Sequence, residues 1–371
     1  MVGLLKFFFL FLPLAVNAGT VELIVNAPFN TEEKEELYLT GNIPGHCQWQ
    51  VKCLKLEKIF DKTFRKVLEL KDHNEFDFKI TRGSWETEAA SSSGRIYPNR
   101  TIKLKEDYTK LVLNIANWSD KKAHGVTGKL ITVKNFLPSP LKEKKTLWIW
   151  LPPSYDSSKK TYPVLYMHDG QNVFDPKTSG FGNEWSVDEV MTALIKEKKI
   201  KEAIVVAIQS GSNRNGEYTY NRQGHLYADF LIKTLKPYID SNYRTKTDRK
   251  NTYLMGSSMG ALISFTILYK HSEVFSKAGA ISLPPFAHDD TLFKWLKKQN
   301  LPKNPVQFYI DHGTHGQDGS YLEHVHRLLR VLEKKGLPKK SIKYEVAPYA
   351  DHTELDWARR VEKPLLYLLS I

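Results

Sequence analysis

The sequence predicts an α/β fold with a mainly parallel sheet, preceded by a small all-β sandwich. Short strand patterns with period-two alternation follow one another over residues 20–117, separated by turn-rich segments. From residue 132 onward, apolar strand patterns alternate with longer helical patterns, which is typical of a parallel sheet covered by helices on both faces. A length of 371 residues fits two domains.

The predicted sandwich spans residues 19–117. Its clearest strand patterns are residues 21–25, 36–40, 76–80 and 111–115. Segments rich in glycine, proline and serine, such as 41–45 and 90–94, separate them. A polar connector over residues 118–127 leads into the second domain.

The predicted α/β domain spans residues 128–371. Its strand patterns are residues 146–151, 164–167, 203–208, 251–255, 278–282, 306–310 and 342–346. Its helical patterns are residues 187–198, 226–242, 261–270, 321–335 and 355–369. Repeated strand-to-helix alternation of this kind predicts a mainly parallel sheet with helices on both faces.

The first 18 residues have the pattern of a signal peptide. Lys6 precedes the apolar run 7–16, and Val16-Asn17-Ala18 is a small-residue cleavage site. A membrane anchor is the alternative, but the run is shorter than the roughly 20 residues that span a bilayer. We therefore expect a secreted or periplasmic protein with no transmembrane anchor in the mature chain.

Net charge and cysteine content bear on the expected partners, disulfides and metal sites of the chain. The net charge of +13 comes from lysines scattered along the chain, without a nucleic-acid-binding motif, so we expect no nucleic-acid partner. The only two cysteines, Cys47 and Cys53, are close in sequence and are expected to form a disulfide in an oxidising compartment. No set of cysteines and histidines has the spacing of a metal site.

The segment around Ser258 is the strongest functional signal. Ser258 stands in a Gly-x-Ser-x-Gly frame between Gly256 and Gly260, directly after an apolar strand and before an apolar helix. Such a turn brings neighbouring backbones too close for side chains at the glycines, and the helix start favours developing negative charge. The pattern predicts a nucleophilic serine.

Two further candidates follow later strands in the order that a Ser–Asp–His triad requires. The loop after residues 306–310 contains Asp311 and Asp318, and either could be the acid. His352 follows residues 342–346 and is the only histidine beyond residue 326. The histidine would take the proton of the serine hydroxyl, and the aspartate would orient the imidazole.

The remaining candidates surround this triad. Backbone N–H groups of Met259 and of Gln171 (or Gly170) are expected to form the oxyanion hole. Substrate contacts are expected from polar or aromatic residues in loops past the strands, namely Trp185, Arg214 and Glu217. A core position is the alternative for Trp185, and His168 at a strand end is expected to be structural.

Four motifs of the second domain occur in family order: residues 162–174, the Gly-Ser-Ser-Met-Gly turn, residues 318–321 and residues 351–354. Over residues 127–371 the chain resembles the esterase branch of the α/β-hydrolases, which includes enterochelin esterases, feruloyl and acetyl-xylan esterases and esterase D. The resemblance implies an α/β-hydrolase fold. It also favours Asp318 over Asp311, because the family's acid follows a Gly-Thr pair and precedes a helix.

The first domain carries a second resemblance. Residues 41–49, 78–86 and 99–101 resemble family 20 carbohydrate-binding modules, which bind starch. This implies sugar contacts from Trp49, Lys79 and Trp85, since aromatic faces stack on sugar rings. A position in the core or at the domain interface is the alternative for Trp49 and Trp85. Cys47 stands where the family has glycine. The sequence also contains N-glycosylation sequons at Asn99 and Asn117.

Together these patterns predict a secreted serine esterase that works through an acyl-enzyme on Ser258, without metal or organic cofactor. Sugar-linked acyl esters are the expected substrates, and a starch-like glycan is a possible partner of the first domain. A siderophore-type lactone, as cleaved by enterochelin esterases, is the alternative substrate. An inactive, glycan-binding protein is the alternative from another class.

Overall fold

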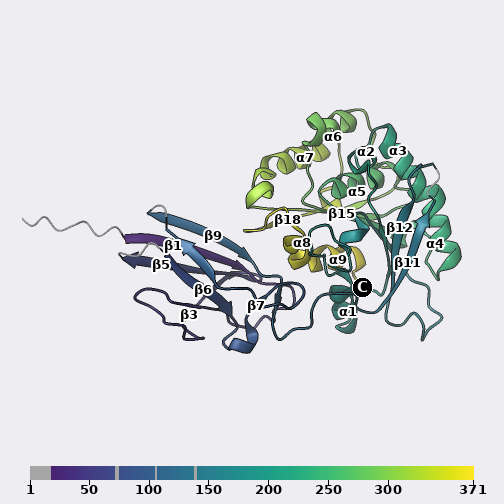
Figure 1. Cartoon of the computed structure of the whole chain (residues 1–371). Helices are drawn as coiled ribbons and strands as arrows, with labels where there is room; N and C mark the ends of the chain where they lie inside the picture. Colours follow the sequence, from purple (N-terminus) through teal and green to yellow (C-terminus); the bar gives the residue numbers. More distant parts are fainter. Residues whose placement is uncertain (1–17, 72–74, 105–106, 138–139) are drawn as a thin grey trace, which may run out of the picture.

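The computed structural model describes residues 18–71, 75–104, 107–137 and 140–371. The predicted signal peptide lies outside these residues, apart from Ala18. In Figure 1 a β-rich domain, coloured purple to blue, lies beside a larger domain of helices around a sheet, coloured teal to yellow. No helix in the described ranges is long and apolar enough to cross a membrane.

The first domain is built from two four-stranded sheets with the orders β4-β5-β1-β9 and β3-β2-β6-β8. Apolar side chains from the facing sides, among them Leu23, Leu39 and Phe78, form its core. Trp118 also lies in this core, so the sandwich extends one residue into the predicted connector. The strands are β1 (Ala18–Asn26), β2 (Tyr38–Gly41), β3 (Leu54–Lys55), β4 (Glu57–Phe60), β5 (Thr63–Lys71), β6 (Glu75–Thr81), β8 (Arg100–Lys103) and β9 (Tyr108–Asn114), with the short pair β7 (Ala89–Ala90) and β10 (Asn117–Trp118).

The second domain has one eight-stranded sheet with the order β11-β12-β14-β13-β15-β16-β17-β18. Strands β11 and β12 pair antiparallel at one edge, and the strands from β14 to β18 are parallel. The bounds are β11 (Lys129–Phe136), β12 (Lys145–Leu151), β13 (Val164–Met167), β14 (Ile204–Ile208), β15 (Thr252–Ser257), β16 (Lys277–Ile281), β17 (Gln307–Gly313) and β18 (Ile342–Ala347). The predicted fold class, a mainly parallel α/β sheet after a β-rich region, is confirmed.

Helices cover both faces of this sheet, and each face has its own apolar core. One core receives side chains from α3 (Arg222–Asp229), α4 (Lys236–Asn242), α5 (Met259–Lys270), α6 (Ala287–Lys297) and α7 (Leu322–Lys334), and the other from α1 (Val187–Lys196), α8 (Glu354–Arg360) and α9 (Glu362–Leu369). A π-helical turn, Phe230–Leu235, joins α3 to α4, and α2 (Arg214–Glu217) is a single turn. Short 3-10 turns are η1 (Trp85–Thr87), η2 (Gly170–Asn172), η4 (Arg249–Asn251), η5 (Gly316–Ser320) and η6 (Lys339–Ser341).

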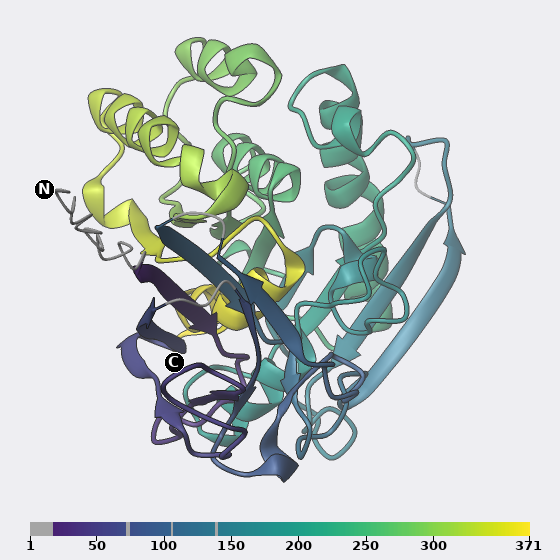
Figure 2. The same ribbon diagram turned by 60° about the vertical axis from the view of Figure 1, so that its left-hand side comes forward.

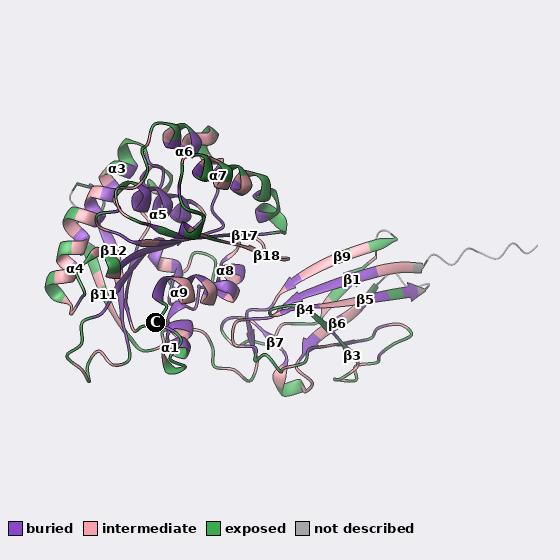
Figure 3. Ribbon diagram, turned by 180° about the vertical axis from the view of Figure 1, so that it is seen from behind, coloured by how far each residue is buried: buried purple, intermediate pink, exposed green. Residues whose placement is uncertain are grey.

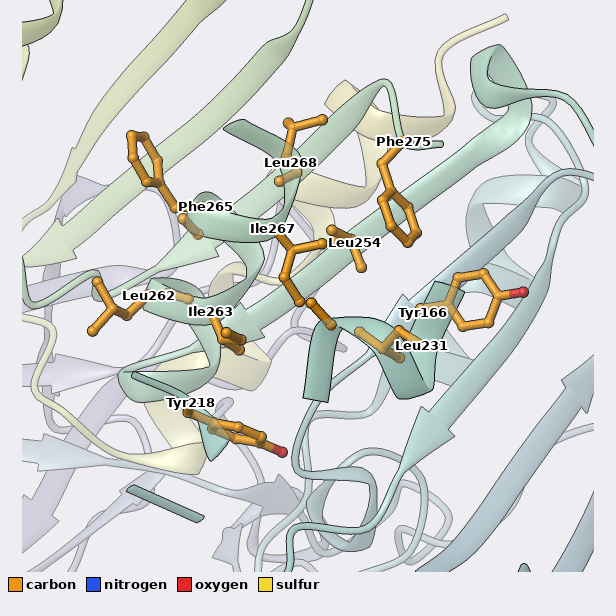
Figure 4. Close-up of a cluster of buried hydrophobic side chains, with 14 of the residues drawn as sticks. Tyr166, Tyr218, Leu231, Leu254, Leu262, Ile263, Phe265, Ile267, Leu268 and Phe275 are labelled. Atoms are coloured by element: carbon orange, nitrogen blue, oxygen red, sulfur yellow. The ribbon is translucent and has the colours of Figure 1, made fainter. Parts of the chain in front are cut away.

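Helix α5 is apolar on every side, because it lies between the sheet and other helices. Nearly all of its residues are buried, as the purple ribbon in Figure 3 shows. In the close-up of Figure 4, Leu262, Ile263 and Ile267 of this helix lie among Leu254 of β15, Tyr218 and Leu231. A helix buried in this way fixes the position of the turn that precedes it, which is the turn of Ser258.

The two domains contact each other through the C-terminal part of the chain, and in Figure 2 the sandwich strands pass in front of this yellow segment. The side chain of Asn114, at the end of β9, donates a hydrogen bond of 2.8 Å to Asp356. Arg359 donates to Asn26 at 2.7 Å and to Thr63 at 2.8 Å. The sandwich is thereby held against the segment that carries His352.

Candidate active site

Ser258 lies in the sharp turn between β15 and α5. Its backbone has φ 53° and ψ −127°, a conformation that side chains rarely adopt and that marks functional turns. A Cβ at Gly256 would lie 2.6 Å from the backbone of Gly260, so the turn can close only with glycine there. The sequence frame thus produces the tight turn that was predicted from it.

The two backbone amides expected to form an oxyanion hole donate no recorded hydrogen bond within the described ranges. Met259 is the first residue of α5, and its N–H therefore has no intrahelical acceptor. Gln171 lies in η2, and within the described ranges neither amide donates to the backbone. The Gln171 side chain is held by Ser210, with its Nε2 donating to Oγ at 2.9 Å and its Oε1 accepting from the Ser210 amide at 3.2 Å.

His352 and Asp318 are joined by a direct hydrogen bond. Nδ1 of His352 lies 2.7 Å from Oδ1 of Asp318, and the ring packs edge-on against Trp357. Because Nδ1 is bound to the carboxylate, Nε2 remains as the nitrogen that can exchange a proton with a serine hydroxyl. His352 and Ser258 line the same pocket.

The second carboxylate oxygen of Asp318 also accepts hydrogen bonds. Oδ2 accepts hydrogen bonds from Oγ of Ser282 at 2.5 Å, from the amide of Gly313 at 2.8 Å and from Nη2 of Arg360 at 3.3 Å. Burial alone would raise the pKa of Asp318, but the bond to His352, the charge of Arg360 and the bond from Ser282 hold it below its ordinary value. The carboxylate is therefore kept ionised.

Asp311, the other candidate acid, has a different set of partners. It accepts hydrogen bonds from the amide of Ser282 at 3.0 Å and from Nε of Arg360 at 3.3 Å, and it is buried. Asp311 does not contact His352 by any hydrogen bond that the structure records. It holds in place the serine and the arginine that contact Asp318.

The pocket at Ser258 has a volume of about 570 Å³ and mixes polar and aromatic walls. Its only lysine or arginine among the described residues is Arg214, which donates to both carboxylate oxygens of Asp169, at 2.6 and 2.8 Å. The other lining residues are Asn114, Gln171, Asn172, Phe181, Asn183, Ser257, Thr353, Glu354, Leu355 and Trp357. Because Asp169 neutralises Arg214, the described pocket residues offer no unpaired lysine or arginine to bind a strongly anionic ligand.

Two predicted substrate contacts need correction. Trp185 does not line the pocket, because it is 1% exposed and packs in the core against Trp357 at 5.5 Å between ring centroids. Glu217 is buried in an ion pair with Lys145 at 2.8 Å, so its carboxylate faces the protein interior. Neither residue is part of the pocket lining.

Sequence reasoning missed several residues that line the pocket. Phe181 is 71% exposed at its rim, and Trp357 forms part of its wall. Asn114 comes from the other domain, at a strand end with no chemical motif around it. The carboxylate of Glu354 accepts from Asn172 at 3.2 Å, and burial raises its pKa. Of these four residues, only Glu354 lies within a motif of the sequence, at residues 351–354.

The sandwich residues expected to bind sugar are placed differently from one another. Trp85 is 41% exposed and Trp49 is half-buried, whereas Lys79 forms an ion pair with Glu88. Cys47 and Cys53 form the disulfide, with 6.0 Å between their Cα atoms. Asn117 is fully buried, so its sequon is inaccessible to glycosylation in the folded chain.

His168, at the end of β13, is buried, and its Nδ1 lies 2.8 Å from the hydroxyl of Tyr227. Burial, and then the charge of Arg214, lowers its pKa to about 3. The unfolded chain binds this proton below about pH 6.5 and the folded chain does not, so stability falls as pH decreases from 6.5 toward 3.

We expect His168→Gln to reduce the loss of unfolding free energy on acidification. The reduction should be about 1 kcal/mol per pH unit between pH 4 and 6, measured by urea unfolding. His315→Gln, at an exposed position, is the matched control. An unchanged pH slope in His168→Gln would show that His168 takes up its proton in the folded state.

The comparison with family models places residues 139–367, more than half of the chain, in the family described as "Putative esterase". Among curated proteins, YjcH of Bacillus subtilis is 26% identical over 247 residues, which are 64% of this chain and 96% of that protein. An endo-1,4-beta-xylanase/feruloyl esterase of Xylanibacter ruminicola is 25% identical over 59% of this chain but only 28% of its own length. The match to YbbA of Bacillus subtilis, 24% identical, spans 36% of this chain and about half of that protein, 54%.

Solved structures share the fold at low sequence identity. A ferulic acid esterase has a TM-score of 0.53 at 22% identity, over 65% of this chain and 98% of its own. The enterobactin esterase of Shigella flexneri has a TM-score of 0.54 at 14% identity, over 94% of this chain and 92% of its own. The second match includes the β-rich domain. The family match, on an α/β-hydrolase fold, establishes that the chain belongs to the Putative esterase family and is a carboxylic ester hydrolase.

Proposed function

We propose that the chain hydrolyses its ester through an acyl-enzyme on Ser258. His352 takes the hydroxyl proton while Oγ attacks the carbonyl carbon, and the N–H groups of Met259 and Gln171 receive the oxyanion. The intermediate then expels the alcohol, which leaves with the proton from His352. A water molecule, activated by the same histidine, releases the acid from the serine. The observation that carries this proposal is the hydrogen bond of 2.7 Å between His352 and Asp318 beside the Ser258 turn.

We propose sugar-linked acyl esters as the substrates. Phe181 and Trp357 offer aromatic surface for an acyl group, and the amides of Asn114, Asn172 and Asn183 offer hydrogen bonds for sugar hydroxyls. The pairing of Arg214 with Asp169 favours uncharged substrates over strongly anionic ones. The similarity to a feruloyl esterase and to a ferulic acid esterase supports an aromatic acyl group.

The sandwich has two roles in this proposal. Asn114 contributes to the pocket wall directly, and the exposed Trp85 with Trp49 is available to stack on a glycan. The leader pattern of the sequence supports an exported protein, and the Cys47–Cys53 disulfide is in keeping with an oxidising compartment. Lys79 is the weakest of the sugar contacts, because Glu88 occupies its ammonium group.

A siderophore-type lactone is the second candidate substrate. The observation that favours it is the similarity to the Shigella enterobactin esterase, which extends over 94% of the chain and includes both domains. The absence of an unpaired cation among the described pocket residues disfavours an iron-loaded catecholate, which carries several negative charges.

A substrate panel distinguishes the two candidates. We expect kcat/KM for a feruloylated pentose to exceed that for a catechol trilactone by at least about tenfold, a difference of roughly 1.4 kcal/mol in transition-state binding. Asn114→Ala should raise KM for the feruloylated sugar several-fold while leaving hydrolysis of p-nitrophenyl acetate unchanged, because only the larger substrate reaches the sandwich.

Thr63→Ala is the matched control for Asn114→Ala. It removes an interdomain hydrogen bond from Arg359 without altering a residue of the pocket. Equal effects of the two variants would mean that Asn114 acts through domain contact alone. A preference for the trilactone would replace the sugar-linked ester with the lactone as the substrate.

A further inference from the structure

Three carboxylates lie together at the start of α1, outside the lining of the Ser258 pocket. Glu184 precedes α1, and Asp188 and Glu189 lie in its first turn. One oxygen from each lies within 4.8 Å of the others, the spread that three ligands of one ion allow at about 2.4 Å each. The side chains of Glu184 and Asp188 are fully buried.

Each of these carboxylates has one oxygen without a partner among the described residues, although the amides of Ser186 and Thr127 donate to the other oxygens of Glu184 and Asp188. Oε1 of Glu184, Oδ1 of Asp188 and Oε2 of Glu189 are buried without a hydrogen-bond partner in the described part of the chain. Among the ion pairs recorded for the described residues, no lysine or arginine reaches any of the three. An uncompensated buried charge costs several kcal/mol, so a group of three calls for a cation or for protons.

A buried histidine from the connector between the domains lies next to this group. The side chain of His124 is 5% exposed, and its Nε2 has no hydrogen-bond partner among the described residues. Its Nδ1 lies 3.9 Å from Oε1 of Glu184. That separation is too long for a hydrogen bond, and the set of ligand atoms within 4.8 Å of one another holds the three carboxylates without His124, so the histidine lies beside the group.

We propose that Glu184, Asp188 and Glu189, next to His124, form a binding site for a divalent cation that prefers oxygen ligands, Ca²⁺ or Mn²⁺. Two positive charges would offset most of the charge of the three carboxylates. Burial, and for Asp188 next the charge of Glu189, raises the pKa of these groups, which reflects the cost of holding them ionised without a cation.

The position of the site gives the cation a structural role. The amide of Thr127, in the connector, donates to Oδ2 of Asp188 at 2.5 Å. The loop before Glu184 carries Phe181 and Asn183 of the pocket, and Oγ of Ser92 in the sandwich donates to the carbonyl of Gly182. The cation would tie the connector to the pocket loop. None of the three carboxylates lines the pocket of Ser258, so the loss of the cation should alter KM more than kcat.

The test uses the untagged mature chain, dialysed against EDTA and then against Ca²⁺ or Mn²⁺. We expect one equivalent of bound cation by elemental analysis and a rise in Tm of about 5 °C or more at a hundredfold excess over Kd. The double variant Glu184→Gln, Asp188→Asn should lose both the bound cation and the rise in Tm. A control pair at exposed positions, Glu197→Gln with Glu333→Gln, should keep them.

A measurement on the unaltered chain covers the case in which the double variant does not fold. Tb³⁺ in the site should give luminescence excited through tryptophan, since Trp185 follows Glu184 in the chain, and Ca²⁺ should displace it. No bound cation and no change in Tm with either metal would overturn the proposal and leave a protonated carboxyl cluster. A full cation response in the double variant would overturn it as well.

Discussion

His352→Ala is expected to lower kcat by on the order of 10⁶-fold, with little change in KM. Without the imidazole, Ser258 has no base to take its proton, and the leaving alcohol has no acid. The measurement is hydrolysis of p-nitrophenyl acetate under single-turnover conditions, which reports acylation directly. Ser258→Ala should lose about as much, and the double variant no more, because the residues of a triad act as a unit.

His324→Ala is the matched control, since His324 lies on α7 outside the pocket. It should keep full activity. A loss of less than about a hundredfold in His352→Ala, in correctly folded protein, would refute the proposed base, because general base catalysis alone is worth roughly 10² to 10⁴-fold.

Asp318→Asn is expected to lower kcat by about 10⁴-fold, the loss known for an equivalent change in a serine protease. The amide can present its NH₂ to Nδ1 of His352, which then leaves the proton on Nε2 and the wrong tautomer facing Ser258. The contacts of Oδ2 with Ser282 and Gly313 hold the side chain in place, so the effect should arise from the tautomer. The pH–rate profile and kcat are the measurements.

Asp311→Asn distinguishes the two acids. Asp311 contacts Ser282 and Arg360, so its change should lower Tm while kcat falls by less than about tenfold. The reverse pattern, with kcat lost in Asp311→Asn and retained in Asp318→Asn, would assign the triad acid to Asp311.

The order of the strands and helices predicted from the sequence agrees with the structure, because the spacing of apolar residues reflects which side chains are buried. The strand predicted at residues 306–310 is β17, and the helix predicted at residues 261–270 is α5 with two more residues at its start. The predicted boundaries differ from the structure where two helices join. The helix predicted at residues 355–369 is divided at Val361 into α8 and α9. Strand β5 was missed, although Phe64, Leu68 and Leu70 alternate within it.

The site was predictable where it depends on local patterns, and not where it depends on distant ones. The Ser258 turn follows from glycines at fixed offsets, and the position of His352 follows from its place after a strand. The role of Asn114 depends on contact between two domains, which no local pattern encodes. Trp185 was predicted to contact substrate but packs in the core, because the sequence alone does not show whether an aromatic residue in a loop faces the ligand or the protein interior.

Intact mass after treatment with a fluorophosphonate tests the central claim most directly. An activated Ser258 should form a single covalent adduct, which is absent from Ser258→Ala and strongly slowed in His352→Ala and Asp318→Asn. No adduct in the folded, unaltered chain, or an adduct that persists in Ser258→Ala, would contradict the account and move the nucleophile away from the turn between β15 and α5.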